Sequence, residues 1–207
     1  MSIKQFPITV LILLCLAVTS LPTYPATPGR VGVIAIVNGQ VFITSGTKTF
    51  KAKPGSLIHE GDKVRALNPA KAKIVFIDDT VINIGRDTEF TVTKSLFSLD
   101  RRIANFDFSK GRFKVAVGKF PSGASEFKVK TPNAIVGVRG TVFWGDTNLD
   151  AICTLEGEVE VTPLSNESAA RPLKAGECAA EFKAGRAIPL TPTAEALKGY
   201  MDEVTPR

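Results

Sequence analysis

The segment Thr131–Phe143 (TPNAIVGVRGTVF) has the pattern of two short apolar strands that meet at an arginine, Arg139, flanked by glycines. It begins in an extended conformation, because the residue before a proline is driven out of the helical region. A guanidinium between residues that favour burial must find partners, since an unpaired buried charge costs several kcal/mol. We therefore predict a buried Arg139 that donates to backbone carbonyls or a carboxylate, either as a structural clamp or as a grip on a ligand. The motif comprises Thr131, Pro132, Gly137, Arg139, Gly140 and Thr141.

Outside this segment, apolar and polar side chains alternate along much of the chain, with the period of two that is typical of β-strands. The alternation is clean in 88–93 and in 126–130, and Asn38-Gly39 is a strong hairpin signal. A strand start of the form Gly-x-Val recurs at Gly39 and Gly157, which suggests stacked repeating units. The sequence therefore predicts an all-β fold of many short strands, either a sandwich or a short β-solenoid-like roll.

One short C-terminal helix is predicted over Thr193–Val204, where Thr191-Pro192 supplies a cap and a first-turn proline. Its apolar positions are few, so we expect it to pack lightly. The expected organisation is a β domain over residues 31–190 followed by a helical tail over 191–207.

Residues 1–20 are predicted to be a signal peptide. Lys4 precedes an uncharged, mostly apolar run of eleven residues, Ile8–Val18, and Val18-Thr19-Ser20 forms a small-residue cleavage site. As a helix the run would rise about 16 Å, well short of the ~30 Å hydrocarbon core of a membrane. Residues 21–30 hold three prolines and predict a disordered leader. We expect a periplasmic or secreted mature chain without a transmembrane span.

Charge and cysteines narrow the partners and the compartment. The net charge of +6 falls to +5 when Lys4 is removed, and it is spread along the chain, which does not predict nucleic-acid binding. Cys153 and Cys178 remain in the mature chain, both in strand-like stretches, and an even number suits an oxidising compartment. They form either a disulfide, which would restrict the unfolded chain by about 3 to 4 kcal/mol, or two free buried thiols.

The sequence gives little support to an enzyme. His59, the only histidine, lies in a polar turn beside Glu60 and Asp62, and no nucleophile-elbow or phosphate-binding glycine motif occurs. Adjacent turn residues diverge, so these three side chains do not predict a metal site. Asp78-Asp79 is interpreted as a hairpin turn and not as a catalytic carboxylate pair. We predict no catalysis, no metal and no cofactor.

Several segments occur in an order that resembles the FecR domain of bacterial envelopes. They are Gly61–Arg65, Asp79–Gly85, Phe127–Thr141, Leu155–Val161 and Leu173–Glu177. The most specific is the Thr-Pro-x-Ala-x-x-Gly-Val-Arg-Gly-Thr pattern within the third. The resemblance spans about residues 33–181 and implies an all-β, non-enzymatic module outside the cytoplasmic membrane. Seven residues precede the apolar run, where the regulator that gives the family its name has a sigma-factor-binding segment, so we expect a free-standing periplasmic member.

Two functional hypotheses follow. The first is a module that binds another cell-envelope protein in a scaffolding or signal-sensing role, by strand addition at an open sheet edge. The second is binding of an anionic glycan by a basic strand face, if the strands that carry the four side chains pair. The same charges could instead form a solvated edge that blocks aggregation. The side chains are Arg112, Lys114, Lys128 and Lys130.

Overall fold

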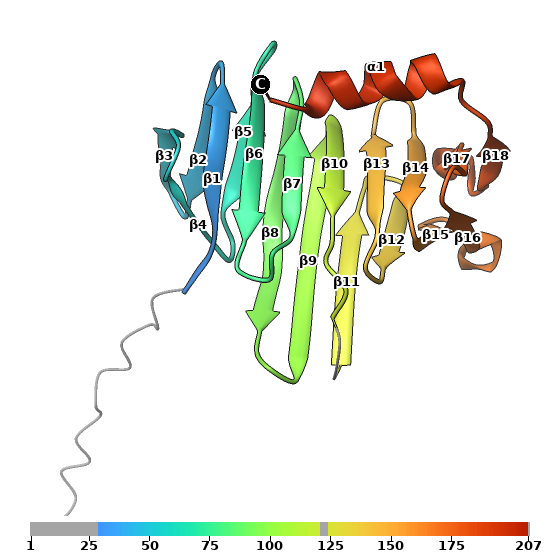
Figure 1. Ribbon diagram of the computed structural model, residues 1–207, viewed down its shortest axis with the longest axis horizontal. Coiled ribbons are helices and arrows are strands. Elements are labelled where there is room, and N and C mark those ends of the chain that lie inside the picture. The colour runs from blue at the N-terminus through green and yellow to red at the C-terminus, as the bar shows by residue number, and fades with distance from the viewer. Residues whose placement is uncertain (1–28, 121–123, 207) are drawn as a thin grey trace, which may run out of the picture.

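The computed structural model describes residues 29–120 and 124–206. This part of the chain forms two nine-stranded sheets packed as a sandwich, with one α-helix near its C-terminal end. Figure 1 shows the strands side by side along the longest axis of the molecule, with the helix lying across one end of them. The all-β class and the short C-terminal helix are confirmed. The predicted signal peptide, and nearly all of the predicted leader, lie outside the described residues.

The strand order of each sheet is as follows. Sheet A runs β18 (Ile188–Leu190), β17 (Cys178–Ala180), β14 (Ala151–Glu156), β13 (Val142–Asp146), β10 (Arg112–Ala116), β7 (Val81–Ile84), β6 (Lys71–Phe76), β1 (Arg30–Asn38) and β4 (Leu57–His59). Sheet B runs β16 (Arg171–Lys174), β15 (Glu158–Pro163), β12 (Ala134–Val138), β11 (Ala124–Lys130), β9 (Arg101–Lys110), β8 (Thr88–Phe97), β5 (Lys63–Ala66), β2 (Val41–Ser45) and β3 (Lys48–Lys51). The helix is α1 (Ala194–Val204), and two 3-10 turns cover Glu167–Ala169 and Phe182–Ala184.

The strand order in both sheets nearly follows the order of the chain. The chain passes back and forth between the sheets as it advances along the long axis, and β9 and β11 form a parallel pair. Each strand therefore lies mainly beside strands that are near it in sequence, as in a solenoid. The two predicted architectures are thus aspects of one structure, a sandwich wound like a roll.

The core lies between the sheets and is rich in phenylalanine. Phe108 of β9 and Phe113 of β10 stack across the sandwich with ring centres 3.9 Å apart, and Phe90 stacks on Phe108 at 4.9 Å. All three rings are fully buried. A Cβ atom at Gly145 would lie 2.4 Å from Phe113, so only glycine fits beside this stack.

A second apolar cluster forms on the outer face of sheet A, under α1. Trp144 is completely buried there, and its ring stacks on that of Tyr200 with centres 4.4 Å apart. Val204, at the end of the helix, is also fully buried. The cluster consists of Trp144, Cys153, Cys178 and Val204, with Leu155, Leu197, Tyr200 and Met201 packed against it.

The helix spans nearly the predicted range, but its cap is Thr193 and not Thr191, so Pro192 precedes the helix and does not lie in its first turn. Thr193 is the N-cap, and its hydroxyl accepts a hydrogen bond from the Ala196 amide at 3.2 Å. Val204 is the one helix residue that is fully buried, and Leu197, Tyr200 and Met201 are partly buried beside it, because the few apolar side chains recur at three- and four-residue spacing and share one face of the helix. Within the described ranges, no helix is long and apolar enough to cross a membrane.

Candidate functional site

The β8–β9 hairpin projects from one end of the sandwich. Figure 1 shows β8, β9 and β11 extending past the neighbouring strands at the lower edge. The turn is fixed by a hydrogen bond from the Ser98 amide to the Arg101 carbonyl, 2.9 Å long, and by one from the Ser98 hydroxyl to Asp100, also 2.9 Å. Ala124 at the start of β11 donates to the Asp100 carbonyl at 3.1 Å. The hairpin is therefore a supported protrusion.

Large apolar side chains gather at this protrusion. Leu99 in the turn is 97% exposed, and Leu96 and Phe97 at the end of β8 are each more than two fifths exposed. Leu96 and Phe97 line a depression of about 600 Å³ with Ile77, and Phe97 lines a second with Leu99, so the exposed apolar side chains surround the hairpin end. A cluster of exposed apolar side chains is typical of interaction sites. The hairpin-tip patch is defined as Ile77, Leu96, Phe97 and Leu99.

A buried arginine, Arg102, lies directly beneath the tip. It is 2% exposed, its Nε donates to the Ser125 hydroxyl at 3.0 Å, and its Nη1 donates to the Gly118 carbonyl at 2.8 Å. The guanidinium carbon lies 5.5 Å from the ring centre of Phe120 and 5.7 Å from that of Phe127, within cation–π range. Its Nη2 is buried and has no hydrogen-bond partner among the described residues.

The carboxylate of Asp78 lies near Arg102. The distance from Arg102 Nη1 to Asp78 Oδ2 is 3.9 Å, and the same oxygen accepts a hydrogen bond from the Thr80 hydroxyl at 2.8 Å. Burial lowers the pKa of the Arg102 guanidinium and the Asp78 charge partly opposes this shift. The guanidinium is thus held as a cation that is incompletely paired.

Arg102 borders the second depression of the tip, which has a volume of about 490 Å³. Its walls combine apolar, cationic and anionic groups. The lining residues are Asp78, Asp79, Phe97, Ser98, Leu99, Arg102, Gly118, Lys119 and Phe120.

The arginine predicted to be buried, Arg139, is exposed. In β12 the side chains of Ala134, Val136 and Val138 point into the core, so the next residue along the chain points away from it. The prediction that Arg139 is buried and donates to backbone carbonyls was wrong, because side chains alternate between the two faces along the strand and Arg139 follows the inward-facing Val138. The buried guanidinium of this fold is Arg102, at an inward position of β9 in line with Phe106.

The rest of the predicted motif builds the turns at the two ends of β12, and the turn at Gly140 lies beside the candidate site. Thr131 Oγ1 accepts a hydrogen bond from the Ala134 amide at 3.0 Å and closes the turn that precedes β12. Gly140 has a φ of +66°, and a Cβ atom there would lie 2.6 Å from Lys119, which lines the depression. The Val117 amide donates to the Thr141 carbonyl at 2.8 Å. The motif therefore has a structural place, and its glycine allows close approach to a wall of the site.

The basic strand face on which the glycan hypothesis depends is not assembled. Strand β10, with Arg112 and Lys114, is in sheet A, whereas β11, with Lys128 and Lys130, is in sheet B. The inward residues of both strands fill the shared core, so the two basic pairs face opposite sides of the sandwich. Lys128 also pairs with Glu126 at 3.0 Å, and Lys130 lies 3.9 Å from Asp107.

The polar turn at His59 is held together by contacts between His59 and Asp62. The Asp62 carboxylate accepts a hydrogen bond from the His59 amide at 2.8 Å and lies 3.4 Å from His59 Nδ1. Within residues 29–120 and 124–206, no group of three or more His, Cys, Asp or Glu side chains is placed to hold a metal ion.

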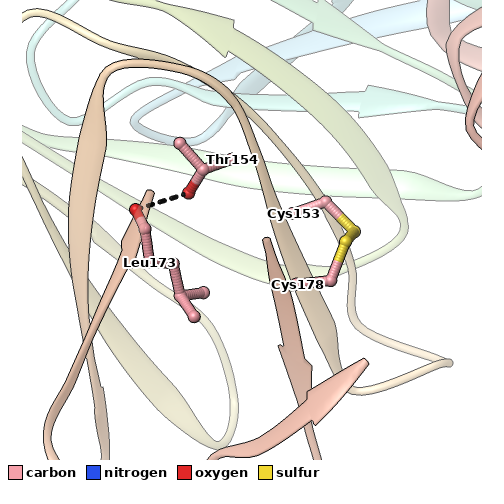
Figure 2. The surroundings of a disulfide bond; sticks show 4 residues. All are labelled: Cys153, Thr154, Leu173 and Cys178. Carbon is pink, nitrogen blue, oxygen red and sulfur yellow. Dashed lines mark hydrogen bonds between the residues drawn. A yellow bond between two sulfur atoms is a disulfide. The ribbon is translucent and has the colours of Figure 1, made fainter. Parts of the chain in front are cut away.

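Cys153 of β14 and Cys178 of β17 are joined by a disulfide, with Cα atoms 4.0 Å apart (Figure 2). The next residue, Thr154, points to the other face and donates to the Leu173 carbonyl of sheet B at 3.1 Å, as Figure 2 also shows. Cys153 is the cross-strand neighbour of Trp144, so the disulfide belongs to the apolar cluster against which α1 packs.

Replacing Cys153 and Cys178 together by alanine is expected to lower the free energy of unfolding by about 3 to 4 kcal/mol, since the bond closes a loop with a sequence separation of 25 residues. Urea unfolding with and without a reductant checks this. The wild-type chain should lose the same stability on reduction, whereas the double variant should not respond. Equal stability of the oxidised and reduced wild-type chains would contradict it.

The candidate site is a projecting hairpin with exposed apolar side chains on a two-sheet β-module, and not an enclosed pocket. The family model described as FecR protein matches residues 62–161, and the resemblance predicted from the sequence is confirmed over this stretch. The matched residues include β8, β9 and β12, and hence the hairpin tip and the whole motif from Thr131 to Thr141.

Two crystal structures of a Parabacteroides distasonis protein, described provisionally as an anti-sigma factor, are similar to this chain. One shares 20% identity with a TM-score of 0.51 and the other 19% with a TM-score of 0.52. Each comparison covers 67% of this chain and 63% or 64% of the other, so this chain spans under two thirds of the length of those proteins. At this identity the likeness concerns the fold alone. No curated protein matches the chain.

Proposed function

We propose that this protein is an exported, non-catalytic module that binds another cell-envelope protein through its hairpin-tip patch, in a scaffolding or signal-sensing role. The observation that carries the proposal is the cluster of exposed apolar side chains at the projecting β8–β9 turn, where Leu99 is 97% exposed. The FecR match supports a regulatory or signalling module, and the structural neighbours described as anti-sigma factors agree with it.

Export is supported by two features of the chain. The N-terminal segment has the composition of a signal peptide, and Cys153 and Cys178 are bonded, as is usual for proteins of the periplasm or cell exterior. A periplasmic or secreted location is therefore part of the proposal.

The tip suits a protein partner better than the β3 edge of sheet B does. At the edge of sheet B all four residues of β3 are exposed, but Lys48 and Lys51 stand at its two ends. Edge lysines are a common protection against strand addition. At the tip, Leu96, Phe97 and Leu99 expose large apolar surfaces, so their burial against a partner would be favourable.

The proposal predicts that a photo-crosslinking amino acid in place of Leu99 captures one reproducible protein in living cells. Adding Phe97→Ser should abolish that crosslink, because it removes apolar surface adjacent to the probe. Crosslinked neighbours would be identified by mass spectrometry.

Two matched controls make this experiment decisive. A probe at Leu164, an exposed leucine remote from the tip, should not capture the same protein. The Phe97→Ser chain should have a lower unfolding midpoint, because Phe97 packs against Phe120, but it should remain folded by circular dichroism at the assay temperature, which separates lost binding from lost structure. Capture that is equal at Leu99 and Leu164, or no reproducible neighbour at Leu99, would contradict the proposal.

A further inference from the structure

We propose that Arg102 binds a carboxylate that the partner presents next to an apolar side chain; this inference rests on the proposed function. The first observation is the unused hydrogen-bonding capacity of the guanidinium. Arginine has five N–H donors, and here Nε and Nη1 have protein acceptors while Nη2 has none among the described residues. An unsatisfied buried donor on a cation is costly, so an incoming acceptor gains more here than at an exposed arginine.

The second observation is the depression that Arg102 borders. Its volume of about 490 Å³ is within the range of sites that take small ligands or a few side chains. Phe97, Leu99 and Phe120 supply apolar walls, and Lys119 adds a second cation. An acidic group alone would leave the apolar walls exposed to solvent, so the bound group should combine a carboxylate with an adjacent apolar side chain.

The charge of the site favours a carboxylate over a phosphate. Two cations, Arg102 and Lys119, stand against two anions, Asp78 and Asp79, in the lining. A dianionic phosphate would meet both aspartates, whereas a singly charged carboxylate can accept from the one guanidinium nitrogen without a partner, Nη2, at a smaller cost in repulsion. Since Nη2 is buried, we expect binding to require a local movement of the side chains that cover it.

The test is a nuclear magnetic resonance titration of the full mature chain with phenylacetate, observing the Arg102 side-chain Nε–H and the Ser98 and Lys119 amides. Phenylacetate should give a saturable shift at these groups. The isosteric neutral phenylacetamide and inorganic phosphate should give none there. Equal shifts with phenylacetamide, stronger shifts with phosphate, or no saturable shift with phenylacetate would overturn the proposal.

Two variants and one control locate the response. Arg102→Lys keeps the charge but removes the fork, so the affinity for phenylacetate should fall by about tenfold or more. Lys119→Gln lies on the surface of the same depression and gives a second readout if Arg102→Lys does not fold; it should weaken binding less. Arg65→Lys alters an exposed arginine paired with Glu89 and should leave the titration unchanged. An unchanged affinity in both site variants would contradict the assignment.

Peptides distinguish the two sources of the carboxylate. An acetylated Leu-Phe dipeptide with a free C-terminus presents a terminal carboxylate, and an acetylated Leu-Phe-Glu amide presents only a side-chain carboxylate. Tighter binding of one than of phenylacetate assigns the source, and binding of the fully neutral Leu-Phe amide at the same site would overturn the proposal. A failed titration with successful crosslinking at Leu99 would remove the carboxylate site and leave the proposed function. A successful titration without crosslinking would keep the carboxylate site and remove the proposed protein-binding function of the tip.

Discussion

Replacing Arg112 by alanine is expected to lower the free energy of unfolding by about 3 to 5 kcal/mol, because it leaves a buried carboxylate without its counter-charge. Arg112 Nε donates to Asp146 Oδ2 at 2.7 Å, and the Asp146 side chain has no exposed surface. Burial lowers the pKa of Arg112, but hydrogen bonds and charge attraction from Asp146 and Glu203 outweigh it and raise the pKa overall. The measurement is urea unfolding followed by circular dichroism and by the fluorescence of the single tryptophan.

A neighbouring arginine provides the control. Arg86 also reaches Glu203, at 3.4 Å, but its side chain is 47% exposed. Exposed ion pairs contribute about 0 to 1 kcal/mol, so Arg86→Ala should change stability little. Similar losses in the two variants would show that the effect comes from Glu203 and the helix, and not from the buried Asp146.

Trp144→Ala is expected to cost about 3 to 5 kcal/mol and to release α1 from sheet A. The indole is completely buried, stacks on Tyr200 at 4.4 Å and lies beside the disulfide, so its removal leaves a cavity under the helix. Trypsin cleavage after Lys198, within α1, should become faster as the helix detaches. Circular dichroism measures the loss of stability.

Trp144→Phe is the matched variant. It keeps an aromatic surface against Tyr200 and should retain most of the stability and most of the protection at Lys198. If Trp144→Ala leaves both unfolding and cleavage unchanged, the packing of α1 on this side chain does not stabilise the fold.

Sequence patterns were sufficient for the fold class because the strands are amphipathic. The alternation in β9 even contains the signal for Arg102, which occupies the same parity as Ala104, Phe106 and Phe108. The same alternation places the Arg139 side chain on the solvent side, because Arg139 directly follows the inward-facing Val138. We assigned burial to Arg139 from the hydrophobicity of its neighbours, and parity along the strand is the better guide.

Long-range arrangement could not be predicted in the same way. Strands β10 and β11 have the same alternating pattern, and nothing local in either indicates that the chain changes sheet between them. The hairpin-tip patch was also missed, because an exposed leucine such as Leu99 becomes informative only when the fold places it beside Phe97. The neighbouring positions of Cys153 and Cys178 could be anticipated, since both lie in strand-like segments.

The course of α1 has a consequence for how the molecule unfolds. A chain wound progressively from one end to the other could fray from either end, strand by strand. Here the last element turns back across the end of the strands (Figure 1). Lys71 of β6 donates a hydrogen bond to the carbonyl of Asp202, and Gly85 lies against Glu203. The helix therefore contacts strands from both halves of the sequence. We expect the two halves to unfold together in one cooperative transition, which the winding of the strands alone would not ensure.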